Sequence, residues 1–267
     1  MKSESGPISA RDYIDRLAAA GRYHFTSADA RQALDVSPEA ARLALNKLSR
    51  QGLIASPARG FYVIVPPEYR SLGCLPAEQF IPALMAQKDR PYYAGLLSAA
   101  QYHGAAHQRP QEFQVFLENN RRPISCGRVR VAFIARKQIA RVPVKKFNTA
   151  RGELLVSTPE ATAIDLAGYP RHAGGHDHVA TILSELAEQI DPTALTEAAD
   201  TAPVPWAQRL GYLLECAGAY QIAHEFRPYV EQRARDYTQL VPGKPIRHAQ
   251  RSSAWKVLVN AEVAPDI

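Results

Sequence analysis

Three polar side chains recur at four-residue intervals in the segment SPEAARLALNKLSR, residues 37–50: Arg42, Asn46 and Arg50. This interval places side chains near one side of an α-helix. Arginine hydrogen-bonds the major-groove edge of guanine, asparagine that of adenine, and both donate to phosphate oxygens. The segment therefore has the chemistry needed to read base edges in the major groove of double-stranded DNA.

A helix that carries these side chains needs a defined start and a buried side. Ser37 is suited to cap the first turn, Pro38 to occupy its first position, and Glu39 to interact with the helix dipole. The apolar spacing predicts a buried seam of Ala41, Ala44, Leu45 and Leu48. The side chains expected to point away from this seam are Glu39, Arg42, Leu43, Asn46, Lys47 and Arg50.

Two shorter helices are expected before this one. Ser9 is a candidate cap for the first, and either Thr26 or Ser27 for the second, which covers residues 28–34. Only two residues, Asp35 and Val36, then separate the second helix from the cap of the third. Two helices joined by a short turn, with the second basic on its free side, are typical of a helix-turn-helix motif.

The segment GLIASPARGFYVIV, residues 52–65, predicts a β-hairpin with strands over 53–55 and 61–65 and a turn that contains Pro57 and Arg59-Gly60. A hairpin directly after a recognition helix is the wing of a winged helix-turn-helix. Arg59 at its tip is expected to contact backbone phosphate or the minor groove. A helix face that is merely solvated, or a winged helix that contacts only protein, is the alternative. The predicted DNA-binding residues are Thr26, Ser27, Ser37, Arg42, Asn46, Lys47, Arg50 and Arg59.

The formal net charge of +6 is distributed unevenly along the 267 residues. Residues 1–65 contain 9 lysines and arginines against 6 acids, and residues 121–151 contain 10 and no acid. A local positive field attracts polyanions, whereas the same charge spread evenly would mainly aid solubility. The charge distribution therefore favours two nucleic-acid surfaces.

The second basic segment predicts a strand on which Arg128 and Arg130 face one side and the intervening valines face a core. Lys145 and Lys146 are expected to extend this surface from the next strand. We expect these four side chains to make additional phosphate contacts. A solvated sheet face, RNA or an acidic partner protein are the alternatives.

Prolines and glycines after the hairpin place a domain boundary near residue 70, between a winged helix-turn-helix domain, 1–70, and a C-terminal domain, 71–267. The expected fold class is α+β, with the second domain larger and of mixed α/β type. Ser157 and Glu160 have the spacing of a capping box for a helix that runs to residue 167. The other expected elements are helices over 76–87 and 91–104, strands over 112–120, 128–136, 141–148 and 152–157, and a mainly helical remainder with a strand at 255–259.

Two residue groups raise the question of catalysis or metal binding. Ser98, His103 and Asp165 are the types of a hydrolase triad, but no Gly-x-Ser-x-Gly motif accompanies them. The other group is the glycine-flanked run RHAGGHDH, with His172, His176, Asp177 and His178. It lacks a second ligand cluster and is typical of an exposed loop. Since a P-loop and a dinucleotide fingerprint are also missing, we expect no catalytic residue, metal or cofactor.

The three cysteines, Cys74, Cys126 and Cys216, are far apart and form no C-x-x-C motif, which favours a reducing compartment. The first residues contain no apolar signal segment, and no run approaches the roughly 18 apolar residues of a membrane span. We therefore expect a cytoplasmic protein without membrane contact.

The winged helix, then YYAGLLSAAQYHG (92–104), a basic strand region and LLVSTPEATAIDLAGY (154–169) resemble, in this order, the AbiEi antitoxins of bacterial abortive-infection, type IV toxin–antitoxin systems. The resemblance is clearest from Ser9 to Tyr169. It implies a repressor that binds inverted repeats in its own promoter, and a C-terminal domain that counters a nucleotidyltransferase-like toxin without requiring a stable complex. By position, it assigns DNA reading to Ser37, Arg42, Asn46 and Arg50, and the wing contact to Arg59.

Two other classes of function remain open from the residues alone. A ligand-sensing winged-helix regulator would need an apolar pocket with convergent polar groups in residues 75–267. A DNA-acting enzyme would need clustered carboxylates there. Since palindromic operators usually need two reading heads, we expect two protomers on one operator, either as a dimer in solution or cooperatively on DNA.

Overall fold

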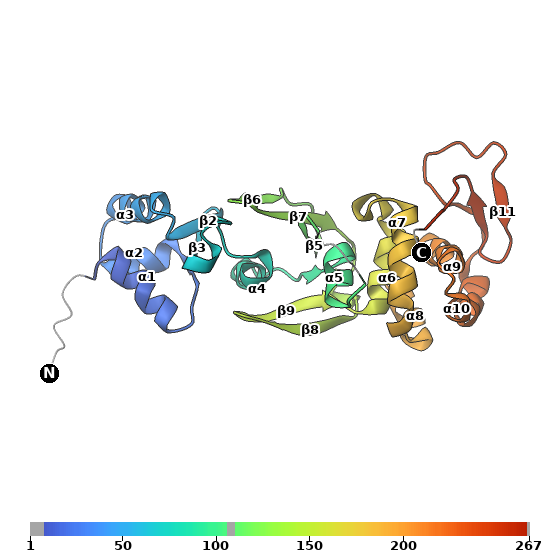
Figure 1. Ribbon diagram of the computed structural model, residues 1–267, viewed down its shortest axis with the longest axis horizontal. Helices are drawn as coiled ribbons and strands as arrows, with labels where there is room; N and C mark the ends of the chain where they lie inside the picture. The colour runs from blue at the N-terminus through green and yellow to red at the C-terminus, as the bar shows by residue number, and fades with distance from the viewer. Residues whose placement is uncertain (1–7, 106–109, 266–267) are drawn as a thin grey trace. The chain divides into compact units, whose positions relative to one another are not determined.

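The computed structural model describes residues 8–105 and 110–265 and has the α+β class predicted from the sequence (Figure 1). The helices are α1 Ala10–Ala19, α2 Ser27–Leu34, α3 Pro38–Arg50, α4 Ala77–Gln87, α5 Leu96–Tyr102, α6 Pro159–Gly168, α7 His176–Leu186, α8 Pro192–Ala199, α9 Val204–Cys216 and α10 Tyr220–Arg233. The strands are β1 His24–Thr26, β2 Ile54–Ala58, β3 Phe61–Ile64, β4 Tyr93–Ala94, β5 Phe113–Leu117, β6 Ile124–Cys126, β7 Val129–Ala135, β8 Val144–Thr149, β9 Gly152–Ser157, β10 Thr238–Gln239, β11 Gln250–Ser252 and β12 Val257–Val259.

The chain forms two compact units that do not follow the predicted boundary at residue 70. The first unit consists of Met1–Tyr92, Gln111–Ala135 and Lys146–Leu154. The second consists of Tyr93–Pro110, Arg136–Lys145 and Leu155–Ile267. The chain thus passes between the units several times. A functional division into 1–70 and 71–267 stays a prediction.

The N-terminal part of the first unit is a three-helix, three-stranded winged helix. Its sheet has the order β1-β3-β2, and both pairings are antiparallel. Phe25 of β1 is fully buried between the rings of Tyr13 on α1 and Tyr62 on β3. The core that fixes α3 against the other helices and the hairpin contains Ile14, Ala30, Leu34, Leu45, Leu48, Leu53, Ile54 and Ile64. This core confirms the helix order and hairpin expected from the apolar spacing. Pro57, expected in the turn, instead lies in β2, whose pairing with β3 is irregular between Ala55 and Ala58.

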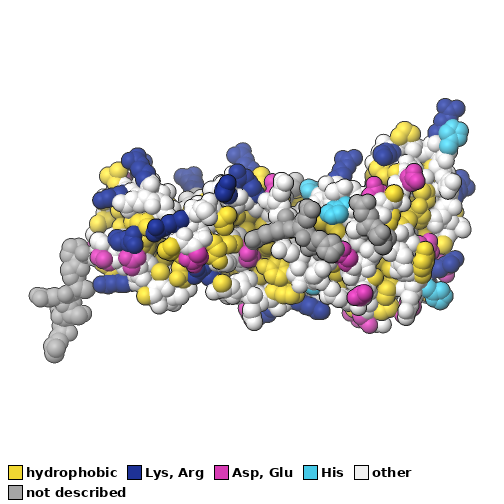
Figure 2. Space-filling view, viewed as in Figure 1, with side chains coloured by type: hydrophobic (Ala, Val, Ile, Leu, Met, Phe, Trp, Pro, Cys, Tyr) yellow, Lys and Arg dark blue, Asp and Glu magenta, His cyan; other side chains and the backbone are white. Residues whose placement is uncertain are grey.

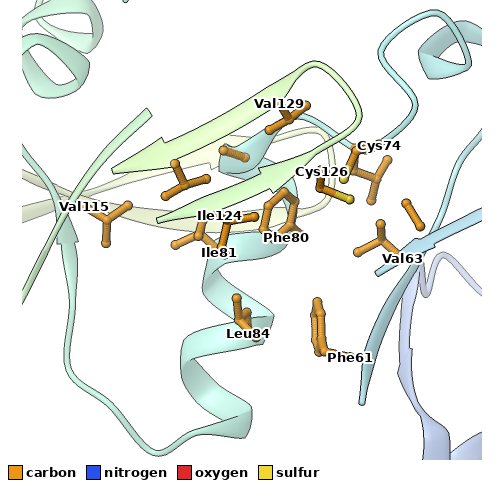
Figure 3. Packing of buried hydrophobic residues seen from close by; sticks show 14 of the residues in the cluster. Phe61, Val63, Cys74, Phe80, Ile81, Leu84, Val115, Ile124, Cys126 and Val129 are labelled. Atoms are coloured by element: carbon orange, nitrogen blue, oxygen red, sulfur yellow. The ribbon is translucent and has the colours of Figure 1, made fainter. Parts of the chain in front are cut away.

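A second core in the same unit explains why it extends beyond residue 70. In Figure 3, Phe61 and Val63 of β3 lie in one apolar cluster with Phe80 and Leu84 of α4, and all four are buried. The cluster is completed by β5, β7 and β6, where β5 pairs parallel and β6 antiparallel with β7. The wing strand is therefore held from both sides, by the helical core and by α4.

The second unit is mainly helical, with the strand pair β4–β9 and a small sheet of order β10-β12-β11. Trp255, just before β12, is fully buried. A β-carbon added to Gly211 on α9 would overlap its ring, so this approach of helix and tryptophan requires glycine. In the described parts of the chain no helix is long and apolar enough to cross a membrane.

Two local expectations for this unit are wrong. The segment expected as a helix over 91–104 begins as strand β4, because Ala94 pairs with Val156 of β9, and the helix itself covers only Leu96–Tyr102. The capping box of Ser157 and Glu160 does not form. Ser157 is the buried last residue of β9, Thr158 caps α6 instead, and Glu160 accepts a hydrogen bond from the Asp191 amide at 3.1 Å.

A buried ion pair lies inside the second unit. Arg136 Nε is 2.8 Å from Asp165 Oδ1, and the two side chains are 2% and 0% exposed. Tyr93 Oη donates to the other carboxylate oxygen at 2.8 Å, and an Arg136 Nη donates to Thr201 at 3.1 Å. Burial raises the pKa of Asp165 to about 6, although Arg136 and the Tyr93 hydrogen bond act in the opposite direction. The carboxylate of Asp165 is thus held by Arg136 and Tyr93 inside the protein core.

Candidate nucleic-acid interface

Helix α3 has the start and the buried side that the sequence predicted. The Ser37 hydroxyl accepts a hydrogen bond from the Ala40 amide at 3.2 Å, and Pro38 occupies the first turn. On the inner side Ala41, Leu45 and Leu48 are buried, whereas Ala44 is only half-buried. The side chains exposed on the outer side are Glu39, Arg42, Leu43, Asn46, Lys47 and Arg50. Figure 2 shows basic and apolar side chains gathered over α3.

The start of α2 is built by a capping box. Thr26 accepts from the Asp29 amide at 3.0 Å, and the Asp29 carboxylate accepts from the Thr26 amide at 2.9 Å and lies 2.8 Å from Arg22. Burial raises the pKa of Asp29, but the Thr26 hydrogen bonds and the Arg22 charge outweigh it and hold that pKa below its ordinary value. The Thr26 side chain is thus committed to the cap, whereas Ser27 is exposed on the first turn.

The wing turn lies against this same helix start. The Ser27 amide donates to the Gly60 carbonyl at 3.1 Å, and Gly60 has φ 75°, a conformation that favours glycine. Arg59, next to it in the turn, is exposed. Ser27 and Arg59 therefore lie close to one another, and both side chains are exposed.

The predicted DNA-binding side chains on α3 and at the hairpin tip are not used in contacts that hold the fold together. Within residues 8–105 and 110–265, the side chains of Arg42, Asn46, Lys47, Arg50 and Arg59 make no hydrogen bond or ion pair. Among the other arginines nearby, Arg11 pairs with Asp15 and Arg22 with Asp29, whereas Arg16 and Arg31 are exposed without a partner in the same residues. Four of the six lysines and arginines without a partner in the described winged helix therefore lie on α3 and the wing, where DNA would contact them.

The second basic segment shows the predicted alternation, and Lys145 and Lys146 lie on the next strand along the chain, β8. Val129 and Val131 are buried, while Arg128 and Arg130 are exposed, and an Arg130 Nη donates to the Gly127 carbonyl at 2.7 Å. Strand β7 has β5 and β6 as its neighbours, so the strand that carries Lys145 and Lys146 is not next to it. A phosphate role for the four residues stays a prediction.

Part of this basic segment serves packing. The Arg151 guanidinium lies 3.3 Å from the centre of the Tyr23 ring, donates to Gln79 Oε1 at 2.8 Å, and is 3.6 Å from a Glu68 carboxylate oxygen. Lys146 pairs with Glu153 at 2.8 Å. Sequence reasoning missed these roles because each depends on a partner brought near only by folding. The count of ten cations without an acid therefore overstates the free charge.

The histidine-rich segment lines a cavity, but it is not the loop expected from its glycines: His172 lies in a 3-10 helix, Pro170–Ala173, and His176, Asp177 and His178 begin α7. His176, Asp177 and His172 contribute to a cavity of about 590 Å³ in the second unit, together with Arg171 and Lys244. Burial lowers the pKa of His176, so its ring is neutral near pH 7. His178 is held elsewhere, 2.9 Å from the Ala173 carbonyl. Among the described residues no group of three or more His, Cys, Asp or Glu side chains is arranged to hold a metal ion.

Comparisons with known proteins agree with this architecture. Residues 12–65 match the family model described as "Transcriptional regulator, AbiEi antitoxin", and residues 93–216 match the "AbiEi antitoxin C-terminal domain". No curated protein matches the chain. A similar solved structure is the RV2827C protein from Mycobacterium tuberculosis, with a TM-score of 0.68 and 18% identity over 96% of this chain and 94% of that one. At this identity the likeness concerns the fold alone.

Proposed function

Because the chain belongs to the AbiEi antitoxin family, in which it is an antitoxin with a regulatory role, we propose that it binds inverted repeats in its own promoter through its winged helix. The observation that carries this proposal is the outer side of α3. Its exposed side chains make no hydrogen bond or ion pair within the described residues: Arg42, Asn46, Lys47 and Arg50. Unpaired donors on a helix that projects from a rigid core suit base-edge recognition.

The wing adds the sequence-independent part of the binding. In this proposal the exposed Arg59 at the hairpin tip neutralises a phosphate, while Arg42 and Asn46 contact guanine and adenine edges. The hairpin is anchored through β3 in two cores, so its tip is held on a rigid support. Because one winged helix reads one half-site, two protomers occupy each operator.

The second activity belongs to the region that matches the C-terminal antitoxin domain, residues 93–216. We propose that this region counters a nucleotidyltransferase-like toxin, that no stable complex is required, and that the protein acts by binding rather than catalysis. The residue types of the suggested triad have other partners, since His103 Nε2 lies 2.7 Å from the Ser157 carbonyl and Asp165 pairs with Arg136. This arrangement supports a non-catalytic role.

The proposal is tested by measuring the Kd of the full chain for the DNA upstream of its own gene and for a scrambled sequence over a series of salt concentrations. We expect selective binding, about 10³-fold tighter or more for the upstream DNA, and a log–log salt slope that reports several phosphate contacts. Equal affinity for the two DNAs, or no binding, would contradict the proposal.

The additional phosphate contacts are tested in the same assay with two paired substitutions. If Arg128 and Arg130 each neutralise one phosphate, changing both to glutamine lowers the salt slope by about 2. The matched pair, Lys145→Gln with Lys146→Gln, removes the same charge, and Lys146 is already paired with Glu153. We therefore expect the arginine pair to have the larger effect. An unchanged slope for both pairs would contradict the additional phosphate contacts and restrict DNA binding to the winged helix.

The cavity favours a second candidate function, regulation of DNA binding by a small molecule. Its volume of about 590 Å³ lies in the range of ligand pockets. Arg171 and Lys244 offer charge to a phosphate, and the rings of Tyr169 and His172 offer apolar faces to a base. The acids Asp177 and Glu262 also line it, so the ligand would need donors as well as an anionic group.

This candidate predicts that a nucleoside monophosphate releases the protein from DNA more effectively than sodium chloride of equal ionic strength. The probes are AMP, GMP, CMP and UMP, and the readout is the Kd for upstream DNA. Arg171→Ala, which lies outside the winged helix, should remove the difference. Equal release by nucleotide and salt would exclude nucleotide regulation.

A further inference from the structure

Leu43 is a large apolar side chain that is exposed on the outer side of helix α3. It is 64% exposed, and the only other large apolar side chain exposed among the described residues of the first unit is Val36, at 38%. Single exposed apolar residues are common on protein surfaces. The position of Leu43, rather than its exposure alone, therefore decides what it does.

Leu43 lies at the centre of the outward side of α3. With about 100° of rotation per residue, the buried residues Ala41, Leu45 and Leu48 define an inward direction, and Leu43 points within about 20° of the opposite direction. Arg42, by the same geometry, lies about 90° away, on the flank of this side. The middle of the surface that would enter a groove is thus apolar.

The neighbours of Leu43 on this side are polar. Asn46 and Lys47 follow it at three and four residues and border it on the helix surface, and Arg50 lies on the same side two turns further along. Glu39, one turn earlier, is the acid of the same side and has the chemistry to accept from a cytosine amino group. An apolar side chain enclosed by hydrogen-bonding ones matches the major groove, whose base edges offer one apolar group, the thymine methyl.

Resting on the proposed DNA binding, we infer that Leu43 contacts the C5-methyl group of a thymine in the major groove and so specifies a T·A pair in each half-site. The contact removes both the leucine side chain and the methyl group from water. Leu43 is the sixth residue of α3, and residues in the N-terminal part of a recognition helix are those that meet base edges.

The experiment replaces single thymines of the upstream DNA by deoxyuridine, which removes only the methyl group, and measures the Kd of the full chain. At one position in each half-site we expect binding about fourfold weaker, which corresponds to about 0.8 kcal/mol for one buried methyl-sized group. Leu43→Ala should bind the unmodified DNA less tightly and be insensitive to the replacement at that position. Leu43→Met, which keeps an apolar contact, should remain sensitive.

Each outcome separates this inference from the function on which it rests. Selective binding without any deoxyuridine effect would overturn the thymine contact and leave the proposed function standing. If Leu43→Ala weakened binding while deoxyuridine had no effect, Leu43 would serve a contact between proteins, which also overturns the inference. A wild-type chain that does not distinguish upstream from scrambled DNA would overturn both. Because Leu43 is exposed, equal Tm values of the variants and the wild type are the control for folding.

Discussion

Replacing Arg42 and Asn46 together by alanine is expected to remove the preference of the protein for its own upstream DNA. Each bidentate contact with a base edge contributes about 1–3 kcal/mol, so the double substitution costs about 2–6 kcal/mol, or roughly 30-fold to 20,000-fold in Kd. Binding to scrambled DNA should fall much less, because it depends mainly on phosphate contacts and only one cation is lost. The measurement is the ratio of the two Kd values.

The two substitutions should affect DNA binding without affecting the stability of the fold. Arg42 and Asn46 are exposed and make no side-chain hydrogen bond within residues 8–105 and 110–265, so their removal should leave the Tm unchanged. A matched control is Arg247→Ala with Gln250→Ala, which removes the same charge and one amide from exposed positions of the second unit. If the control lost selectivity as well, or if the α3 variant kept it, the reading role would have to be assigned elsewhere.

The parts of the winged helix that the sequence predicted correctly are those determined by local contacts. Ser9 accepts from the Asp12 amide and Ser37 from the Ala40 amide, each three residues away. Cap and helix are then encoded together within a few residues, and the apolar seam needs only the helical period. The exposed position of Arg42 and Asn46 follows from the same two facts.

The errors arise where a distant partner changes a local preference. Ser157 and Glu160 have the spacing of a capping box, yet β-pairing buries Ser157 at the end of β9, and Glu160 binds an amide 31 residues away. Strand β1 was missed because three residues give no alternation, and it exists because it pairs with β3. Neither pairing is visible to an argument based on periodicity.

The second basic segment illustrates the same limit for function. A count of charges along the sequence treats Arg151 and Arg128 alike. In the fold, Arg151 is engaged by Tyr23 and Gln79, whereas Arg128 is exposed. Only the residues whose charge is left free by the fold can contribute fully to counterion release. The size of a basic patch is thus a property of the structure and not of the composition.

Arg136→Met is expected to have the largest effect on stability, because it leaves the Asp165 carboxylate buried without its counter-charge. The carboxylate is fully buried, and Arg136 is the cation 2.8 Å from it. Breaking a buried pair by removing one partner typically costs about 3–5 kcal/mol. We expect a loss of this size in the free energy of unfolding at pH 7.5, measured by denaturant titration of the full chain.

The loss should depend on pH in a defined direction. The folded pKa of Asp165, raised to about 6 by burial, rises further once Arg136 no longer lowers it. A carboxyl whose folded pKa is above its unfolded value of about 3.9 loses stability as pH rises between the two values. Below pH 5 the carboxyl is protonated in both folded proteins, so the deficit of the variant should be lower there than at pH 7.5, by up to about 2 kcal/mol, and should grow as pH increases above 6.

A second substitution distinguishes stranded charge from lost packing. Arg136→Met combined with Asp165→Asn removes both charges, while the asparagine oxygen still accepts the Tyr93 hydroxyl in place of the carboxylate oxygen that lies 2.8 Å from it. Replacing a buried ion pair by uncharged groups is often neutral, so the double variant should regain most of the stability and lose the added pH dependence. If the double variant were as unstable as Arg136→Met, the arginine stem and its contact with Trp206 would account for the effect instead, because only the packing would then be missing from both proteins.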